Sequence, residues 1–84
     1  MNADQQILFD YATTDLVDYV MRYERKPMRA AMSIVYGSKL QRKLEDPGTG
    51  LYREGPVYLY DMLCEERGIK SRVGKVLAKR GRSQ

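Results

Sequence analysis

Basic side chains that could contact nucleic acid gather in two places along the 84-residue sequence. The final sixteen residues carry six basic and no acidic side chains: Lys70, Arg72, Lys75, Lys79, Arg80 and Arg82. A second group lies between Gly37 and Pro47 and consists of Lys39, Gln41, Arg42 and Lys43. Lysine and arginine bind phosphate, and glutamine and arginine can also read base edges. Both groups are therefore candidate nucleic-acid contacts.

Residues 69–84 form a basic tail on a body that is close to neutral. Residues 1–68 carry nine basic and eleven acidic side chains, so the net charge of +4 comes from the tail. Its two glycines, Gly74 and Gly81, predict a partly helical segment that gives way to disorder. Three environments stay open for it: solvent, an acidic protein surface and nucleic acid. No apolar run is long enough to span a bilayer, and the tail lacks aromatic anchors, so we expect no membrane association.

Residues suited to catalysis or metal binding are scarce. The sequence contains no histidine, the usual general base, and its single cysteine, Cys64, has no partner at metal-ligand spacing. The segment Gly48-Thr49-Gly50 lacks the Gly-Lys-Ser/Thr that completes a phosphate-binding loop, so turn geometry explains its glycines better. We expect no enzyme activity, no cofactor and no small-molecule substrate. A lone cysteine and a polar N-terminus without signal-peptide character favour the cytoplasm.

Helices must position the basic and tyrosine side chains that could bind a partner. Capping residues, prolines and the spacing of apolar residues predict four helices, over residues 4–23, 27–36, 39–45 and 56–67. The predicted fold is a small all-α bundle, with a helical domain over residues 1–68 and an optional basic helix or tail over 69–84. Asn2 and Gln5 are suited to form a capping box for the first helix, and Ser38 is suited to cap the third.

The apolar spacing also predicts which side of each helix faces the core. In the first helix the inner residues are Leu8, Phe9, Ala12, Leu16, Tyr19, Val20 and Tyr23. In the second helix they are Met28, Ala31, Met32, Val35 and Tyr36. In the fourth they are Val57, Leu59, Tyr60, Leu63 and Cys64. This position predicts that Cys64 is a buried and unreactive thiol.

Two tyrosines are candidates for a partner surface. Tyr52 follows Leu51 inside a loop that otherwise consists of turn-forming residues, between Pro47 and Pro56. An apolar pair in such a loop predicts that Tyr52 folds back onto the core between the first and fourth helices. The alternative is that Tyr52, together with Tyr58, is exposed and marks a partner surface, because tyrosine is enriched at interfaces.

The two helices around Gly37 are also consistent with a helix-turn-helix. In that hypothesis Lys39, Gln41, Arg42 and Lys43 would contact DNA from the helix over residues 39–45. Two observations weigh against it. Pro47 limits this helix to about two turns, and helices joined by a glycine-containing turn occur in many helical domains.

Five segments carry a resemblance to a group of known proteins: residues 18–21, 34–40, 43–46, 49–52 and 57–63. Together they are similar to short, uncharacterised helical proteins of anaerobic and gut bacteria. Those proteins look like small partners encoded in toxin–antitoxin-like gene neighbourhoods. The resemblance covers roughly residues 7–66 and centres on the loop Thr49-Gly50-Leu51-Tyr52. It implies a helical fold and a protein partner, and it defines no catalytic residues. The tail from Ile69 lies outside it.

These observations lead us to expect a non-enzymatic interaction protein, similar to the antitoxin-like partner of a neighbouring gene product. Self-association would also suit so short a chain, because a small domain buries a limited share of its surface. The alternative is a nucleic-acid-binding regulator that uses either the basic tail or the helix over residues 39–45.

Overall fold

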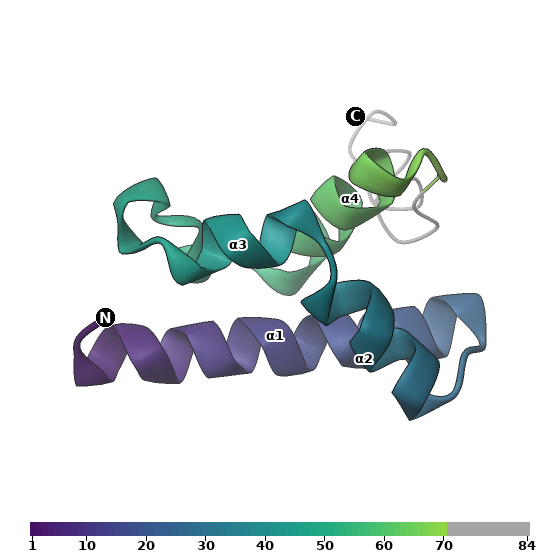
Figure 1. Ribbon diagram of the computed structural model, residues 1–84, viewed down its shortest axis with the longest axis horizontal. Coiled ribbons are helices and arrows are strands. Elements are labelled where there is room, and N and C mark those ends of the chain that lie inside the picture. Colours follow the sequence, from purple (N-terminus) through teal and green to yellow (C-terminus); the bar gives the residue numbers. More distant parts are fainter. Residues whose placement is uncertain (71–84) are drawn as a thin grey trace, which may run out of the picture.

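The computed structural model describes residues 1–70, and these residues form a small all-α domain (Figure 1). The predicted fold class is therefore confirmed. The elements are α1 (Ala3–Glu24), α2 (Met28–Tyr36), α3 (Lys39–Glu45), the 3₁₀ turns η1 (Pro47–Thr49) and η2 (Leu51–Arg53), and α4 (Pro56–Arg67). The expectations for the tail from Ser71 onward lie outside the described residues.

The long helix α1 organises the domain. The predicted capping box is present: the Asn2 side chain accepts the Gln5 N–H, and the Gln5 side chain accepts the Asn2 N–H. Arg25 ends the helix in the left-handed region, at φ 53°. In Figure 1, α3 and α4 lie along one edge of α1, and α2 crosses its C-terminal half. Along the N-terminal half of α1, no described element covers the opposite edge.

The core lies between the covered side of α1 and the three shorter helices. Its buried members are Ala12, Leu16, Val20, Ala31, Val35, Leu40, Leu44, Leu59, Tyr60, Leu63 and Cys64. Tyr60 of α4 packs edge-on against Tyr19 of α1, with ring centroids 5.7 Å apart. Tyr19 in turn packs edge-on against Tyr23 at 5.4 Å, so an aromatic cluster joins α1 to α4. The predicted inner stripe of α4, including the buried Cys64, is confirmed except at Val57, which is only partly buried.

The predicted inner face of α2 is wrong for three of its five residues. Ala31 and Val35 are fully buried, but Met28, Met32 and Tyr36 are 58%, 37% and 55% exposed. The apolar residues of α2 span a wider arc than its contact with α1 covers, so only the residues at the centre of that contact are buried. Leu8 of α1, also predicted to face inward, is 42% exposed.

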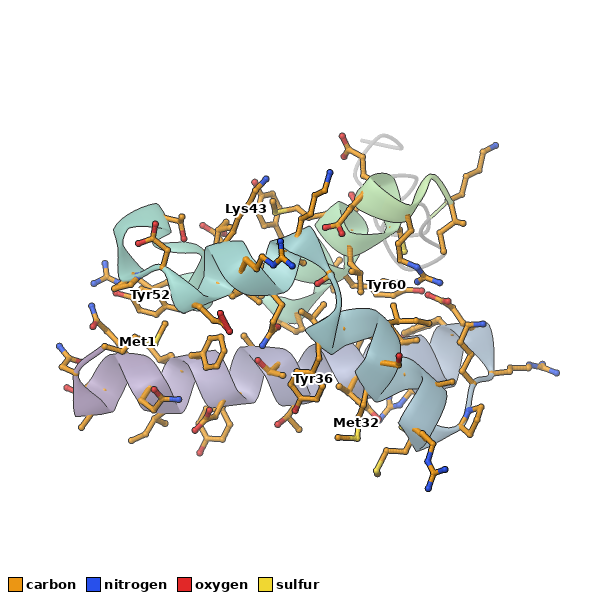
Figure 2. All side chains as sticks on the ribbon, viewed as in Figure 1. Met1, Met32, Tyr36, Lys43, Tyr52 and Tyr60 are labelled. Carbon is orange, nitrogen blue, oxygen red and sulfur yellow. The ribbon has the colours of Figure 1, made fainter. Side chains whose placement is uncertain are left out.

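Tyr52 is 4% exposed, so the prediction that it folds back onto the domain is confirmed. Its position differs from the prediction, because η2 packs against α1 and α3 rather than between α1 and α4. The hydroxyl of Tyr52, a residue labelled in Figure 2, accepts a hydrogen bond of 3.1 Å from Gln5 Nε2. Gly50, at φ 69°, supplies the left-handed turn that leads into η2. Because it is buried, Tyr52 cannot belong to an exposed partner surface.

Replacing Tyr52 with alanine should lower the free energy of unfolding by about 3 kcal/mol, the usual cost of truncating a buried aromatic side chain. Tyr52→Phe removes only the hydrogen bond to Gln5 and should cost about 1 kcal/mol or less. The matched control is Tyr58→Ala, because Tyr58 is 53% exposed, and it should change stability by less than about 0.5 kcal/mol. Urea denaturation measures all three. Equal losses for Tyr52→Ala and Tyr58→Ala would contradict this packing.

Candidate functional site

The uncovered side of α1 and the adjoining side of α2 form an apolar groove of about 380 Å³. The side chains that line it are Thr14, Val17, Asp18, Met21, Met28, Met32 and Tyr36. Figure 2 shows Met32 and Tyr36 reaching from α2 toward the edge of α1 that faces away from α3 and α4. Met28, Met32 and Tyr36 thus remain accessible where the sequence predicted part of the core, and the partly buried Met21 of α1 lines the groove with them.

An exposed apolar stripe continues from this groove toward the N-terminus of α1. Tyr11 is 65% exposed and Ile7 is 51% exposed. Ile7, Tyr11, Thr14, Asp18 and Met21 are spaced alternately by four and three residues, so they share one face of the helix. We call this stripe together with the groove the α1–α2 face. The repeat is visible in the sequence, but it was missed because the inner stripe of α1 is the stronger apolar pattern.

Charges along α1 are unevenly distributed. Residues 1–21 contain four aspartates and no lysine or arginine, whereas basic residues begin at Arg22 and continue through the turn into α2. Within the groove, Asp18 pairs with Arg22 at 3.2 Å on the exposed helix surface. Acidic residues thus extend along α1 as far as Asp18, and unpaired basic residues gather only at its C-terminal end and in the turn into α2.

A nucleic-acid contact requires exposed side chains, and only some of the residues predicted to form one on α3 are exposed. Lys39, Arg42 and Lys43 are exposed. Gln41 was predicted to contact nucleic acid, but it is 4% exposed and donates a 3.1 Å hydrogen bond to Thr13 of α1. That prediction is wrong, because the amide faces the core side of the helix. Of the tail residues, Lys70 is exposed, while Arg72, Lys75, Lys79, Arg80 and Arg82 lie outside the described part of the chain.

A carboxylate occupies the N-terminus of α3. The Glu66 side chain of α4 accepts the backbone N–H groups of Lys39 and Leu40, at 2.8 and 2.9 Å. Ser38 caps the same helix through the N–H of Gln41, as predicted. In helix-turn-helix proteins the N-terminal residues of the recognition helix approach the bases. Here a negative charge from Glu66 would meet the DNA phosphates first, which weighs against the helix-turn-helix hypothesis.

A hydrogen-bonded ion pair joins the C-terminal ends of α1 and α4. Arg67 donates two hydrogen bonds to the Glu24 carboxylate, at 2.7 and 2.8 Å, and the Tyr60 hydroxyl donates a third at 2.8 Å. Burial alone raises the pKa of Glu24, but the bonds from Arg67 and Tyr60 outweigh it, so the pKa lies below its ordinary value of 4.5. Glu24 is therefore a fixed anion that holds α4 in place. This pair was not predicted from the sequence.

Cys64 and Tyr60 are poorly suited to reactivity. Burial raises the pKa of the Cys64 thiol. Burial also raises the pKa of the Tyr60 hydroxyl, and the negative charge of Glu24 raises that pKa further. Cys64 is 1% exposed. Because the thiolate is the reactive form of cysteine, this environment fits the predicted structural role.

Over residues 1–70, no three side chains of the metal-ligating types lie close enough together to hold a metal ion. None of the helices in this part of the chain combines the length and the apolar character needed to cross a bilayer. No protein-family model matches the sequence, and neither a curated protein nor a solved structure does. The α1–α2 face is therefore the strongest candidate site, and Tyr58 on α4, exposed as expected, lies outside the groove.

Replacing Glu24 with glutamine should lower the free energy of unfolding at neutral pH by about 2 kcal/mol, because Arg67 loses its ionised partner in a partly buried site. The control is Asp18→Asn, which breaks the exposed pair with Arg22 and should cost less than about 0.5 kcal/mol. Thermal or urea unfolding of both variants measures the difference. Equal effects would show that the Glu24 junction does not stabilise the domain.

The same pair makes a prediction about pH. Because the pKa of Glu24 is lower in the folded state, its contribution to stability is complete above the unfolded pKa, near 4.5. That contribution disappears as the pH falls through the lower folded value. The wild-type protein should therefore lose stability over this acid range, and Glu24→Gln should show a smaller loss. Identical pH profiles for the two proteins would contradict the assignment.

Proposed function

We propose that this protein is a non-enzymatic interaction domain that binds a partner protein through the α1–α2 face. The observation that carries the proposal is the exposure of Met28, Met32 and Tyr36 around one apolar groove. Small domains bury such side chains when they can, and an exposed apolar cluster of this kind typically marks an interaction site. Methionine is frequent at protein-binding surfaces, because its flexible side chain adapts to different shapes.

The chemistry of the groove favours binding over catalysis. Its polar lining residues are Thr14, Asp18 and the hydroxyl of Tyr36. The Asp18 carboxylate is already paired with Arg22 on the helix surface. No nucleophile lies beside a general base in this lining, which a covalent mechanism would need. A shallow apolar groove flanked by two helices instead suits the apolar face of a helix from another chain.

The partner class that we propose is a protein encoded near this one, because the sequence resembles antitoxin-like proteins of that kind. We also propose a cytoplasmic location, since the single thiol of Cys64 suits a reducing compartment. A second candidate function, nucleic-acid binding, is favoured by the exposed Lys39, Arg42 and Lys43 on α3. Glu66, at the N-terminus of the same helix, opposes it.

The experiment is co-purification with the products of adjacent genes, followed by titration of any protein that binds. Met32→Lys places a charge in the groove and should weaken binding about thirtyfold, the loss of about 2 kcal/mol expected at the centre of an interface. Because Met32 is 37% exposed, the domain should remain folded, and circular dichroism checks this. Tyr58→Lys on α4 is the matched control and should leave binding unchanged.

Two results would contradict the proposed binding face. Loss of binding in Tyr58→Lys with full binding in Met32→Lys would move the partner surface to α4. Binding of duplex DNA that falls steeply with salt, with no protein bound, would favour the nucleic-acid function instead.

A further inference from the structure

We propose that the partner segment bound by the α1–α2 face is an amphipathic α-helix with an acidic N-terminal end and a basic C-terminal end, and that it lies antiparallel to α1. The inference rests on the proposed function, since it uses the same face, and it adds the chemistry and the direction of the bound segment. The apolar side chains of the face determine the length of that segment, and the charges at the two ends determine its direction.

Apolar side chains run along the whole α1–α2 face. Met21, Met28 and Met32 line the groove at its C-terminal end, and Ile7 and Tyr11 are 51% and 65% exposed at its N-terminal end. Ile7 and Met21 are fourteen residues apart, which is about 21 Å along a helix, so a bound helix of about four turns would cover the face. A bound strand would leave its backbone groups unpaired, because α1 and α2 use their own backbone groups internally.

The N-terminal half of this face is bordered by negative charge. Asp4 and Asp10 are exposed, and each is three residues from Ile7. On a helix this spacing places them about 60° to either side of Ile7, so they flank the apolar stripe on both sides. Residues 1–21 contain no lysine or arginine that could neutralise them. The end of a partner segment that lies over Ile7 is therefore basic.

The opposite end of the face is bordered by positive charge. Arg25, Lys26 and Arg29 lie between the last turn of α1 and the first turn of α2, and Arg29 directly follows Met28 of the groove lining. Within residues 1–70 none of the three basic side chains forms an ion pair. Glu24 does not neutralise them, because its carboxylate is already bound at the junction with α4. The end of the partner segment that lies here is therefore acidic.

These charges select one direction for the bound helix. Helices commonly carry acidic residues in the first turn and basic residues in the last, where they interact favourably with the helix dipole. Antiparallel to α1, such a helix meets opposite charges at both ends, whereas in the parallel direction it meets like charges at both ends, which opposes association. The α1 helix of a second copy fits poorly, because in an antiparallel pair centred on Thr14 its Asp18 would face Asp10.

The test is selection from a display library of helical peptides of roughly 18 residues, long enough for about five turns. All peptides have apolar positions spaced by three and four residues, and their two ends carry charged residues in every combination of sign. On the immobilised full-length chain, peptides with an acidic N-terminus and a basic C-terminus should be enriched. A synthetic peptide of this class should bind at least about tenfold more tightly than the same peptide with its two charged ends exchanged. Fluorescence anisotropy measures both affinities.

A charge-reversed variant tests the contact at the basic end. Arg25→Glu/Arg29→Glu should bind the selected peptide at least about tenfold more weakly, because like charges then meet at that end. Both side chains are exposed, so the variant should fold, and circular dichroism checks this. The matched control is Lys39→Glu/Lys43→Glu on α3, which makes the same change of charge away from the face and should leave binding unchanged.

The proposal is overturned if no class of peptide is enriched, or if the enriched peptides show no charge preference or the opposite one. It is also overturned if the control variant weakens binding as much as Arg25→Glu/Arg29→Glu does, or if the chain forms a dimer that the peptides do not displace. A protein partner that is lost in Met32→Lys, with no preferred class of peptide, would remove this inference alone. If Met32→Lys binds both the protein partner and the peptide like the wild type, the proposed function fails as well.

Discussion

The burial of one stripe of α1 is the constraint on which the rest of this domain depends. Ala12, Leu16 and Val20 form the centre of that stripe, and each shorter helix packs against or around it. The 22-residue α1 is much longer than α2, α3 and α4, which have 9, 7 and 12 residues. Three short helices can cover one side of such a helix, but they leave the other side in water. An uncovered face is thus a consequence of the element lengths.

Charged hydrogen bonds, as well as apolar packing, hold the helices of the domain together. Arg67 reaches the end of α1 through Glu24, and Glu66 reaches the start of α3 through two backbone N–H groups. Adjacent residues at the end of α4 therefore hold two other helices. Such charged bonds are stronger than neutral ones. Both carboxylates are thereby fixed between helices, the one of Glu24 partly buried and the one of Glu66 at the exposed start of α3.

Local sequence signals predicted the elements well, because caps and prolines act over a few residues. Asn2, Ser38 and Gly68 end or begin helices where the sequence indicates. Long-range placement was harder to predict. The 3.6-residue period shows that Met28, Met32 and Tyr36 share a broad apolar side of α2, but it does not show how much of that side α1 covers.

The candidate site escaped prediction for the same reason. Tyr52 and Tyr58 were candidates for a partner surface only because tyrosine is frequent at interfaces. In the structure, η2 packs against α1 and α3, and Tyr52 is buried there. Gln41 has the chemistry of a base reader, but its position on α3 points it at Thr13. The alternating repeat from Ile7 to Met21 was a local signal and could have been found. Its significance became clear only from the packing, which leaves Ile7 and Tyr11 exposed and places Met21 beside α2.

The central claim is that α1 buries one side and leaves the other open, and the rate of thiol labelling tests it most directly. In a Cys64→Ala background, Tyr11→Cys places a thiol on the open side, where Tyr11 is 65% exposed, and Val20→Cys places one on the buried side, where Val20 is 0% exposed. A maleimide should label residue 11 of the native protein about as fast as in the urea-unfolded chain, and it should label residue 20 much more slowly. Equal labelling rates at the two positions in the native protein would contradict the account.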